Sequence, residues 1–202
     1  VVGWFMVESG LVNNTTVSHY RLAIHLTIAL VIVSMIFWLI LNIKKTTFKN
    51  FFRISYNNAP FQILIFLIFF QTILGAFVSG LDAGKIYQTW PLMGQTFVPN
   101  DFVFNNFKSL FEFDNHSLVQ FYHRNLAYII AFYIFILTFF ILKNKLNDLY
   151  SPIILLVIFL SLQIFLGILT LISGINIYLA SAHQITSVFL IISSINLYFC
   201  TK

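Results

Sequence analysis

Three histidines, His25, His123 and His183, lie inside strongly apolar stretches of this sequence, and Arg21 and Arg124 lie close to two of them. Ionisable residues are costly inside a lipid bilayer, so those that occur there are functional candidates by default. Each of the three histidines lies within about two helical turns of the same end of its apolar stretch. The imidazoles are therefore predicted to share one depth in the membrane.

Imidazole at a shared depth is suited to holding iron. Neutral imidazole is a good iron ligand, and haem iron is commonly held by axial histidine. Helix bundles build such sites from side chains on facing helices. His123 and His183 are the pair that one bundle could complete, and an iron with two histidine ligands has no open position, so it would relay electrons. The alternative is that each imidazole reaches the interface or hydrogen-bonds a neighbour.

Polar residues near these histidines are candidates for supporting roles. Arg124 directly follows His123, and its guanidinium could pair in bidentate fashion with a haem propionate or, alternatively, with a lipid phosphate. Gln120 and Gln184 could orient a ligand as outer partners, although glutamine is also ordinary at an interface.

The elements that position these residues must be membrane-spanning helices. The chain has 202 residues, of which 59% are apolar and only 8% are charged, with a formal net charge of +5. This composition excludes an ordinary soluble enzyme, a disordered tail and a nucleic-acid-binding module. We predict an all-α, polytopic transmembrane bundle of about five spans. The expected spans are 19–42, 60–80, 118–142, 151–172 and 176–200, and residues 1–11 resemble the tail of a further span.

The charges in the loops predict an orientation. The segment between the first two spans carries four basic residues and no acid, whereas the loop over residues 81–117 carries a net charge of −2. The positive-inside rule therefore places the basic segment in the cytoplasm or an organelle matrix and the long loop outside. A loop of this length is uncommon without a role. We expect it to cover the mouth of a site, the alternative being a disordered connector.

Short sequence repeats indicate a duplicated bundle. The run from Gln71 to Gly75 is echoed by the run from Gln163 to Gly167, and Gly3 stands at the same distance from a Ser-Gly pair as Gly167 does. A histidine-containing span follows in each case. Together these features suggest a duplicated helical bundle whose first copy is cut short. The glycines inside spans are expected to allow close helix packing.

Other kinds of site are not supported. Cys200 is the only cysteine, so neither an internal disulfide nor a cysteine-based metal site can form. The sequence has no glycine-rich phosphate loop, no paired carboxylates inside a span and no Ser/His/Asp order on a soluble scaffold. Asp82, the acid closest to a span end, is expected to tether the outer loop.

With these residues in view, the chain resembles the haem A synthase family. The resemblance rests on HYRLAIHL at 19–26, LGAFVSGLDAGKIYQTWPLMG at 74–94, VQFYHRNLAY at 119–128 and LASAHQ at 179–184. It runs over essentially the whole chain, in order. The type is the one found in mitochondria and proteobacteria, since no cysteine pair occurs in an outer loop.

The resemblance implies two similar four-helix halves. Residues 1–59 would be a remnant of the first, substrate-haem half, and residues 60–202 would be a complete second half. The second half would bind haem b through His123 and His183 as axial ligands, and His25 would belong to the substrate-haem site. The family's catalytic carboxylate lies in a Glu-x-x-His arrangement that this sequence lacks, so no catalytic residue is assigned.

The function implied is an oxidoreductase that converts a methyl group of haem O to a formyl group, giving haem A for cytochrome oxidase. Implied partners are haem O, membrane lipid, a haem O synthase, cytochrome oxidase assembly factors and further copies of the chain, with no nucleic acid. The implied location is a bacterial or mitochondrial inner membrane. The chain, which begins with Val1, would be an N-terminally truncated piece of a longer protein, a truncated gene product or half of a split enzyme. The alternative function is a b-type cytochrome subunit that transfers electrons without a substrate site.

Overall fold

The computed structural model describes residues 1–10, 17–45, 48–53, 55–101 and 107–201. These residues form helices joined by turns and one long loop, with no β-strand among them. The α-helices are α1 (Val2–Glu8), α2 (His19–Lys45), α3 (Ala59–Gly80), α4 (His116–Lys143), α5 (Tyr150–Ile172) and α6 (Ile177–Cys200). Short 3-10 helices are η1 (Ala83–Lys85), η2 (Phe107–Phe111) and η3 (Asn147–Leu149).

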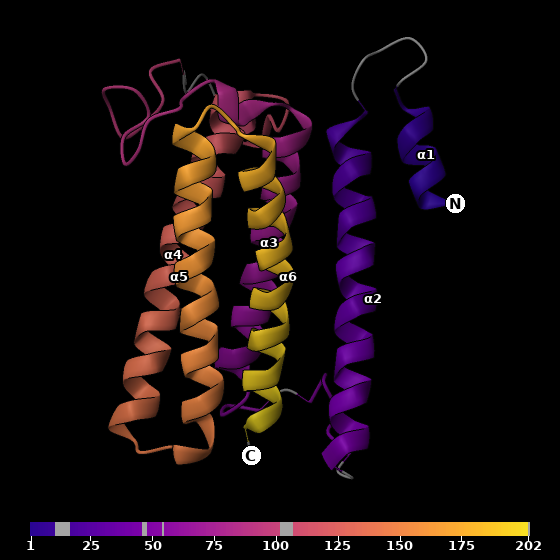
Figure 1. Ribbon diagram of the computed structural model, residues 1–202, viewed down its shortest axis with the longest axis vertical. Helices are drawn as coiled ribbons and strands as arrows, with labels where there is room; N and C mark the ends of the chain where they lie inside the picture. Colours follow the sequence, from indigo (N-terminus) through magenta and orange to yellow (C-terminus); the bar gives the residue numbers. More distant parts are fainter. Residues whose placement is uncertain (11–16, 46–47, 54, 102–106, 202) are drawn as a thin grey trace.

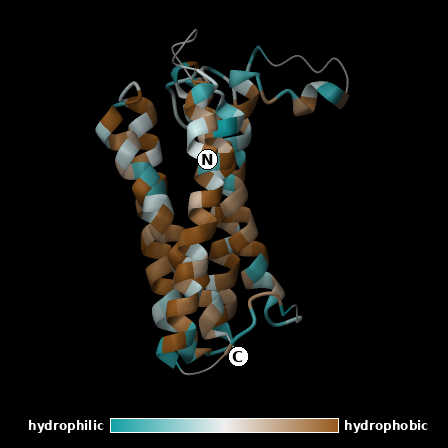
Figure 2. Ribbon diagram, turned by 90° about the vertical axis from the view of Figure 1, so that its right-hand side faces the viewer, coloured by the Kyte–Doolittle hydropathy of each residue, from teal (hydrophilic) through white to brown (hydrophobic). Residues whose placement is uncertain are grey.

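The five expected spans are confirmed, and their ends differ from the predicted ones by no more than one helical turn. Each of the five is long and apolar enough to cross a membrane. Large apolar side chains such as Met35, Phe66 and Phe135 are about two-thirds exposed on the outward faces of the helices. Figure 2 shows apolar residues along the helix bodies and hydrophilic residues gathered at the two ends. The chain is therefore a multi-pass membrane protein.

Helices α3 to α6 form an antiparallel four-helix bundle, and α2 lies beside it against α3 and α6 (Figure 1). Helix α1 packs on α2. One end of the bundle, here called the loop end, carries the loop between α3 and α4. The opposite end, here called the basic end, carries the described residues of the α2–α3 linker (48–53 and 55–58) and the α4–α5 turn. Helices α2 and α3 approach closely at the loop end, where a Cβ added to Gly80 would lie 2.6 Å from the Cβ of His19.

The densely packed core lies in the half of the bundle nearer the basic end. Most of its fully buried side chains come from the N-terminal halves of α3 and α5 and the C-terminal halves of α4 and α6. They are Leu64, Ile68, Ile134, Ile141, Ile153, Leu156, Ile191, Ile195, Leu197 and Tyr198. Burial of large apolar side chains with close contacts stabilises this half. The bundle is thus anchored at the basic end, away from the histidines.

Side chains outside the spans terminate the helices. Asn115 accepts a hydrogen bond from the amide of Leu118 at the start of α4, and Asn176 caps α6 in the same way. At the other end of α6, the ammonium of Lys49 in the α2–α3 linker donates to the carbonyl oxygens of Tyr198 (2.7 Å) and Thr201 (2.6 Å). Charged donors at a helix C-terminus satisfy otherwise unpaired carbonyls and interact favourably with the helix dipole.

The environment of Lys49 also affects its titration. Burial lowers the pKa of Lys49 to about 8, with a smaller opposing contribution from Cys200 and one in the same direction from Lys45. The ammonium therefore still carries its charge at neutral pH. It also lies 4.6 Å from the centre of the Tyr198 ring, which adds a cation–π contact.

Replacing Lys49 with Met should destabilise the protein by about 2 kcal/mol, because the last carbonyls of α6 lose a charged donor. Lys44→Met is the matched control, since Lys44 is an exposed cation in the last turn of α2. Thermal unfolding in detergent, followed by helical circular dichroism, should show a lower melting temperature for the Lys49 variant alone. Equal melting temperatures for both variants would contradict the capping role.

Candidate functional site: the glycine-packed histidines

The three membrane histidines occupy equivalent positions in their helices. His25 is the seventh residue of α2, His123 the eighth of α4 and His183 the seventh of α6. All three helices start at the loop end, so a rise of 1.5 Å per residue puts each imidazole about 10 Å below that end. The shared depth predicted from the sequence is confirmed by the helix bounds.

Each histidine ring packs on a glycine of the preceding helix. A Cβ added to Gly75 of α3 would lie 3.2 Å from Cε1 of His123, and one added to Gly167 of α5 would lie 2.9 Å from Cε1 of His183. The same contact occurs a third time, between Gly3 of α1 and His25, at 3.1 Å. A methyl group at any of these positions would crowd the ring. The glycines therefore leave the space that the imidazoles occupy.

In the four-helix bundle, a glutamine one turn before the glycine contacts the same ring. The backbone carbonyl of Gln163 lies 3.0 Å from Nδ1 of His183, and the side-chain amide nitrogen of Gln163 lies 3.3 Å from Nε2. A carbonyl oxygen can only accept, so Nδ1 must carry the proton. An amide nitrogen can only donate, so Nε2 presents its lone pair. Both contacts thus favour the tautomer with the proton on Nδ1 and the lone pair on Nε2. This is the form of the ring that can bind a metal through Nε2.

Gln71 holds His123 through its side chain. Its amide nitrogen donates to the backbone carbonyl of His123 (2.9 Å) and lies 3.1 Å from Nδ1 of the same ring. By the same argument this contact leaves the lone pair on Nδ1 and the proton on Nε2, which is the opposite of the His183 tautomer. The side-chain oxygens of Gln71 and Gln163 are both buried without a hydrogen-bond partner among the described residues. Buried polar atoms are normally paired, so these two carbonyl oxygens leave hydrogen-bonding capacity beside each ring.

The bundle is less densely filled at the level of the histidines than at the basic end. No residue is buried from Phe121 to Ile129 in α4, from Val157 to Ile172 in α5 or from Ile177 to Ile185 in α6. His123 and His183 are themselves half-buried. Among the described residues, no three metal-ligating side chains cluster. The arrangement therefore offers two imidazole ligands at a level where α4, α5 and α6 have no buried side chain.

Arg124 faces the outer loop. Its guanidinium donates hydrogen bonds to the carbonyl oxygens of Tyr87 (2.8 Å), Thr89 (2.9 Å) and Leu92 (3.2 Å). Gln120, one turn earlier, also donates to the carbonyl of Tyr87, at 2.9 Å. The three arginine bonds use one Nη2 and two Nη1 hydrogens, which leaves the Nε hydrogen and one Nη2 hydrogen for another acceptor. The loop is thus fastened directly beside the His123 helix turn.

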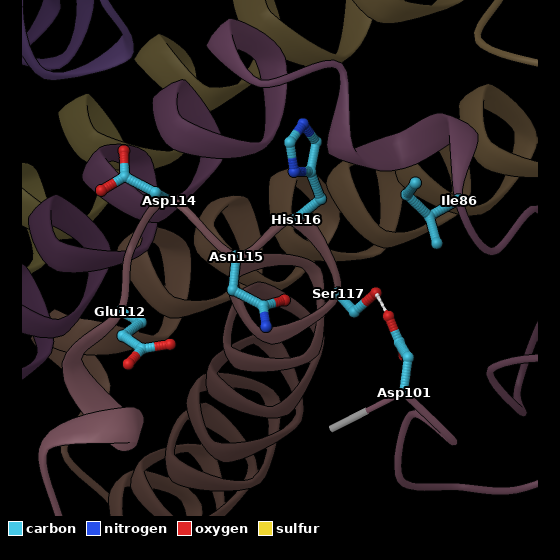
Figure 3. Close-up of a pocket in the computed structure, with 7 residues that line it drawn as sticks. All are labelled: Ile86, Asp101, Glu112, Asp114, Asn115, His116 and Ser117. Carbon is cyan, nitrogen blue, oxygen red and sulfur yellow. Dashed lines mark hydrogen bonds between the residues drawn. The ribbon is translucent and has the colours of Figure 1, made fainter. Parts of the chain in front are cut away.

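Further hydrogen bonds order the loop over the helix ends. Asp101 accepts from the hydroxyl groups of Tyr87 (2.6 Å) and Ser117 (2.5 Å), the latter shown in Figure 3. Burial alone would raise the pKa of the Asp101 carboxyl, but these two bonds outweigh it and lower the pKa. Glu112 and Asp114 line the same open, acidic pocket of about 570 Å³ (Figure 3). The described part of the loop is thus hydrogen-bonded to the first turns of α4.

The loop also docks on the turn between α5 and α6. A Cβ added to Gly84 would lie 2.7 Å from Cδ1 of Ile175, so the absence of a side chain admits the isoleucine. Ile175 has φ of +63°, a left-handed conformation that is unusual for a β-branched residue. Its amide donates to the carbonyl of Thr170 at 2.9 Å, which helps to hold that conformation. Asp82 pairs with Lys85 at 2.9 Å and tethers only this local turn.

His25 belongs to a separate pair of helices. Its side chain lies against Gly3 of α1, outside the four-helix bundle, and is exposed. Near it, Arg21 donates to the carbonyl of Phe5 at 2.7 Å and so joins α2 to α1. The structure therefore groups His123 and His183 in one bundle and places His25 with α1.

Sequence reasoning considered the wrong glutamines as outer partners. Gln120 binds the loop and Gln184 is exposed, whereas Gln71 and Gln163 contact the rings. The signal was present in the sequence as the repeated Gln-x-x-x-Gly spacing. That spacing puts the glutamine and the glycine on one helix face, one turn apart.

The fold and the site together define a polytopic membrane protein with histidines paired inside a helical bundle. The chain belongs to the COX15-CtaA family of cytochrome oxidase assembly proteins, whose family model matches residues 1–195.

The chain is similar to several bacterial proteins named heme A synthase. That of Pelagibacter ubique is 45% identical over 196 residues, covering 96% of this chain and 56% of the relative. That of Wolbachia pipientis wMel is 41% identical over 194 residues, covering 96% and 54%. That of Rickettsia canadensis is 36% identical over 209 residues, covering 100% and 60%. The chain thus spans a little over half the length of these relatives. No solved structure matches it.

Replacing Gly167 with Ala should displace the His183 ring, because the new methyl group would lie within 2.9 Å of it. Alanine favours a helix over glycine by about 1 kcal/mol, so α5 itself should not weaken. Crowding a packed contact costs about 1–3 kcal/mol, so the variant should unfold at a lower temperature despite the helix gain. Thermal unfolding in detergent, followed by circular dichroism, measures this. Ser161→Ala, at an exposed site on α5, is the control and should keep its melting temperature.

Proposed function

We propose that this chain is part of a haem A synthase, in which residues 60–202 form a haem b half and residues 1–59 contribute to a substrate-haem half. The observation that carries the proposal is the pair His123 and His183. The two rings lie at one depth, each packs on a glycine, and each has a glutamine beside it. The names of the relatives supply the reaction class.

The residues present fit a haem b. Two imidazoles from different helices could hold an iron, and the tautomer of His183 leaves Nε2 free of a proton. The lack of buried side chains at this level of α4, α5 and α6 agrees with a bound group there. A haem b held by both imidazoles would supply one-electron transfer.

The chain's own residues orient and shield that site. Gln163 fixes the proton on Nδ1 of His183, and Gln71 restrains the ring of His123. Arg124 holds the outer loop over the helix ends and, with its remaining N–H groups, is proposed to pair with a haem propionate. The loop then limits water at the mouth of the site.

His25 is proposed to serve the substrate haem. It repeats the glycine contact of the other two histidines but does so against α1, so it belongs to a second site. The substrate would be haem O, and its methyl group would be oxidised to a formyl group. Neither Glu8 nor Glu112 stands three residues before a histidine, so the family's carboxylate is not assigned to this chain.

The same proposal implies a location, an orientation and partners for the protein. The protein would act in a bacterial or mitochondrial inner membrane, with the loop end outside and the basic end facing the cytoplasm or matrix. A haem O synthase would supply the substrate. Cytochrome oxidase assembly factors would receive the product, and copies of the chain would associate with each other.

Changing His123 or His183 to Ala should abolish the low-spin haem b signal in a reduced-minus-oxidised visible spectrum of the purified chain, because one axial imidazole is lost. His25→Ala should keep that signal, since His25 lies outside the bundle. His116→Ala is the control, because His116 is an exposed histidine on the same helix as His123.

An unchanged bis-histidine spectrum in both the His123 and the His183 variants would refute the ligand assignment. Loss of haem b in the His25 variant would show that the division of the two halves is wrong. Circular dichroism of each variant separates loss of a ligand from loss of the fold.

The reaction itself can be tested by supplying the part of a relative that this chain does not match. The chain would be joined to the unmatched part of the Pelagibacter ubique relative and expressed together with a haem O synthase. Pigment extracted from the membranes should then contain haem A. A preparation that binds haem b but yields only haem O would contradict the proposed activity, because the haem b signal shows that the protein has folded.

A further inference from the structure

A basic groove opens at the basic end of the protein, where α2, the α2–α3 linker and the end of α6 meet. Its volume is about 650 Å³, and its lining includes Lys45, Lys49 and Arg53. The described residues that line it include no Asp or Glu. Three cations in one groove repel each other, so an anion between them would be stabilised.

The groove lies at the level of the membrane interface. Helix α2 ends at Lys45, α3 begins at Ala59 and α6 ends at Cys200, so the lining residues sit where the apolar spans stop. Phe48, Phe52 and Tyr56 of the same linker are all more than 80% exposed. Exposed aromatic rings of this kind are typical of the interface with lipid headgroups. A groove at this depth is therefore in contact with lipid headgroups.

The three cations are not equivalent. Lys49 is engaged by the C-terminus of α6, whereas the guanidinium of Arg53 makes no hydrogen bond or ion pair with the described part of the chain. Lys45 lies over the ring of Phe199 at 5.4 Å and donates to Sγ of Cys200 at 3.8 Å. Arginine binds phosphate in bidentate geometry, and lysine adds a point charge. Arg53 is therefore the residue best placed to hold a phosphate, and Lys45 and Lys49 add positive charge beside it.

We propose that this groove binds the phosphate of an anionic glycerophospholipid in the inner leaflet. Phosphate diesters are the anions available at this depth, and basic pockets between helices on the cytoplasmic or matrix side recognise such headgroups. The bound lipid would join α2 and the linker to α6. The site is separate from the histidines, which lie near the opposite end of the bundle, so it stands independently of the proposed function.

The test is binding of phosphatidylglycerol to the full chain in detergent, measured by native mass spectrometry and by the shift in melting temperature. Phosphatidylcholine is the zwitterionic comparison, and inorganic phosphate at equal concentration distinguishes a free anion from a lipid. The variant pair is Lys45→Gln with Arg53→Gln. The matched control is Lys143→Gln with Lys145→Gln, which removes the same charge from the α4–α5 turn at the same end.

Phosphatidylglycerol, and not phosphatidylcholine, should bind and raise the melting temperature of the unchanged protein and of the control pair. The groove variant should bind roughly 10–30-fold more weakly, since each basic residue near a lipid surface contributes to binding. If the double variant unfolds, Arg53→Gln alone, at an exposed linker site, should still bind phosphatidylglycerol more weakly than the unchanged protein does.

Three results would overturn the proposal. Equal binding of both lipids would show that charge is not recognised. Equal weakening in the groove and control pairs would show that only the total charge matters. Stabilisation by inorganic phosphate to the same extent as by phosphatidylglycerol would assign the groove to a free anion.

Discussion

The contact between an imidazole edge and a glycine on the preceding helix is the constraint on which the site depends. It occurs at His25, His123 and His183, and in each case an added Cβ would lie within 3.2 Å of the ring. The contact fixes the distance between two helices and the direction of the ring at once. Helix spacing and ligand geometry are therefore set by the same pair of residues. The glutamine one turn away, at Gln71 and Gln163, then restrains the remaining rotation of the ring.

Different interactions hold the bundle together at different depths. Close packing of side chains such as Leu64, Ile134 and Tyr198 holds the helices together near the basic end. Nearer the loop end, hydrogen bonds that Arg124 donates and that Asp101 accepts fasten the loop to the first turns of α4. The level between the two is occupied by the histidines and lacks buried side chains in α4, α5 and α6.

The sequence was sufficient for some of these features and not for others. Span positions follow from long apolar runs, and the common depth of the histidines follows from counting residues along them. The partners of Arg124 could not be predicted, because they are backbone carbonyls of a loop whose path depends on long-range contacts. The choice between Gln71 and Gln120 depends on the rotation of each helix about its axis. Spacing restricts that rotation, but only packing determines it.

The uneven distribution of buried side chains has a consequence for motion. Local opening of a protein requires free energy in proportion to the contacts that must be broken. Opening at the level of His123 and His183 breaks few buried contacts, whereas opening beside Ile68 or Ile195 would disrupt the core. Thermal fluctuations should therefore be largest at the histidine level, and hydrogen exchange should be slowest near the basic end. The histidine level can therefore open locally while the core near the basic end and the hydrogen-bonded loop at the other end stay in place.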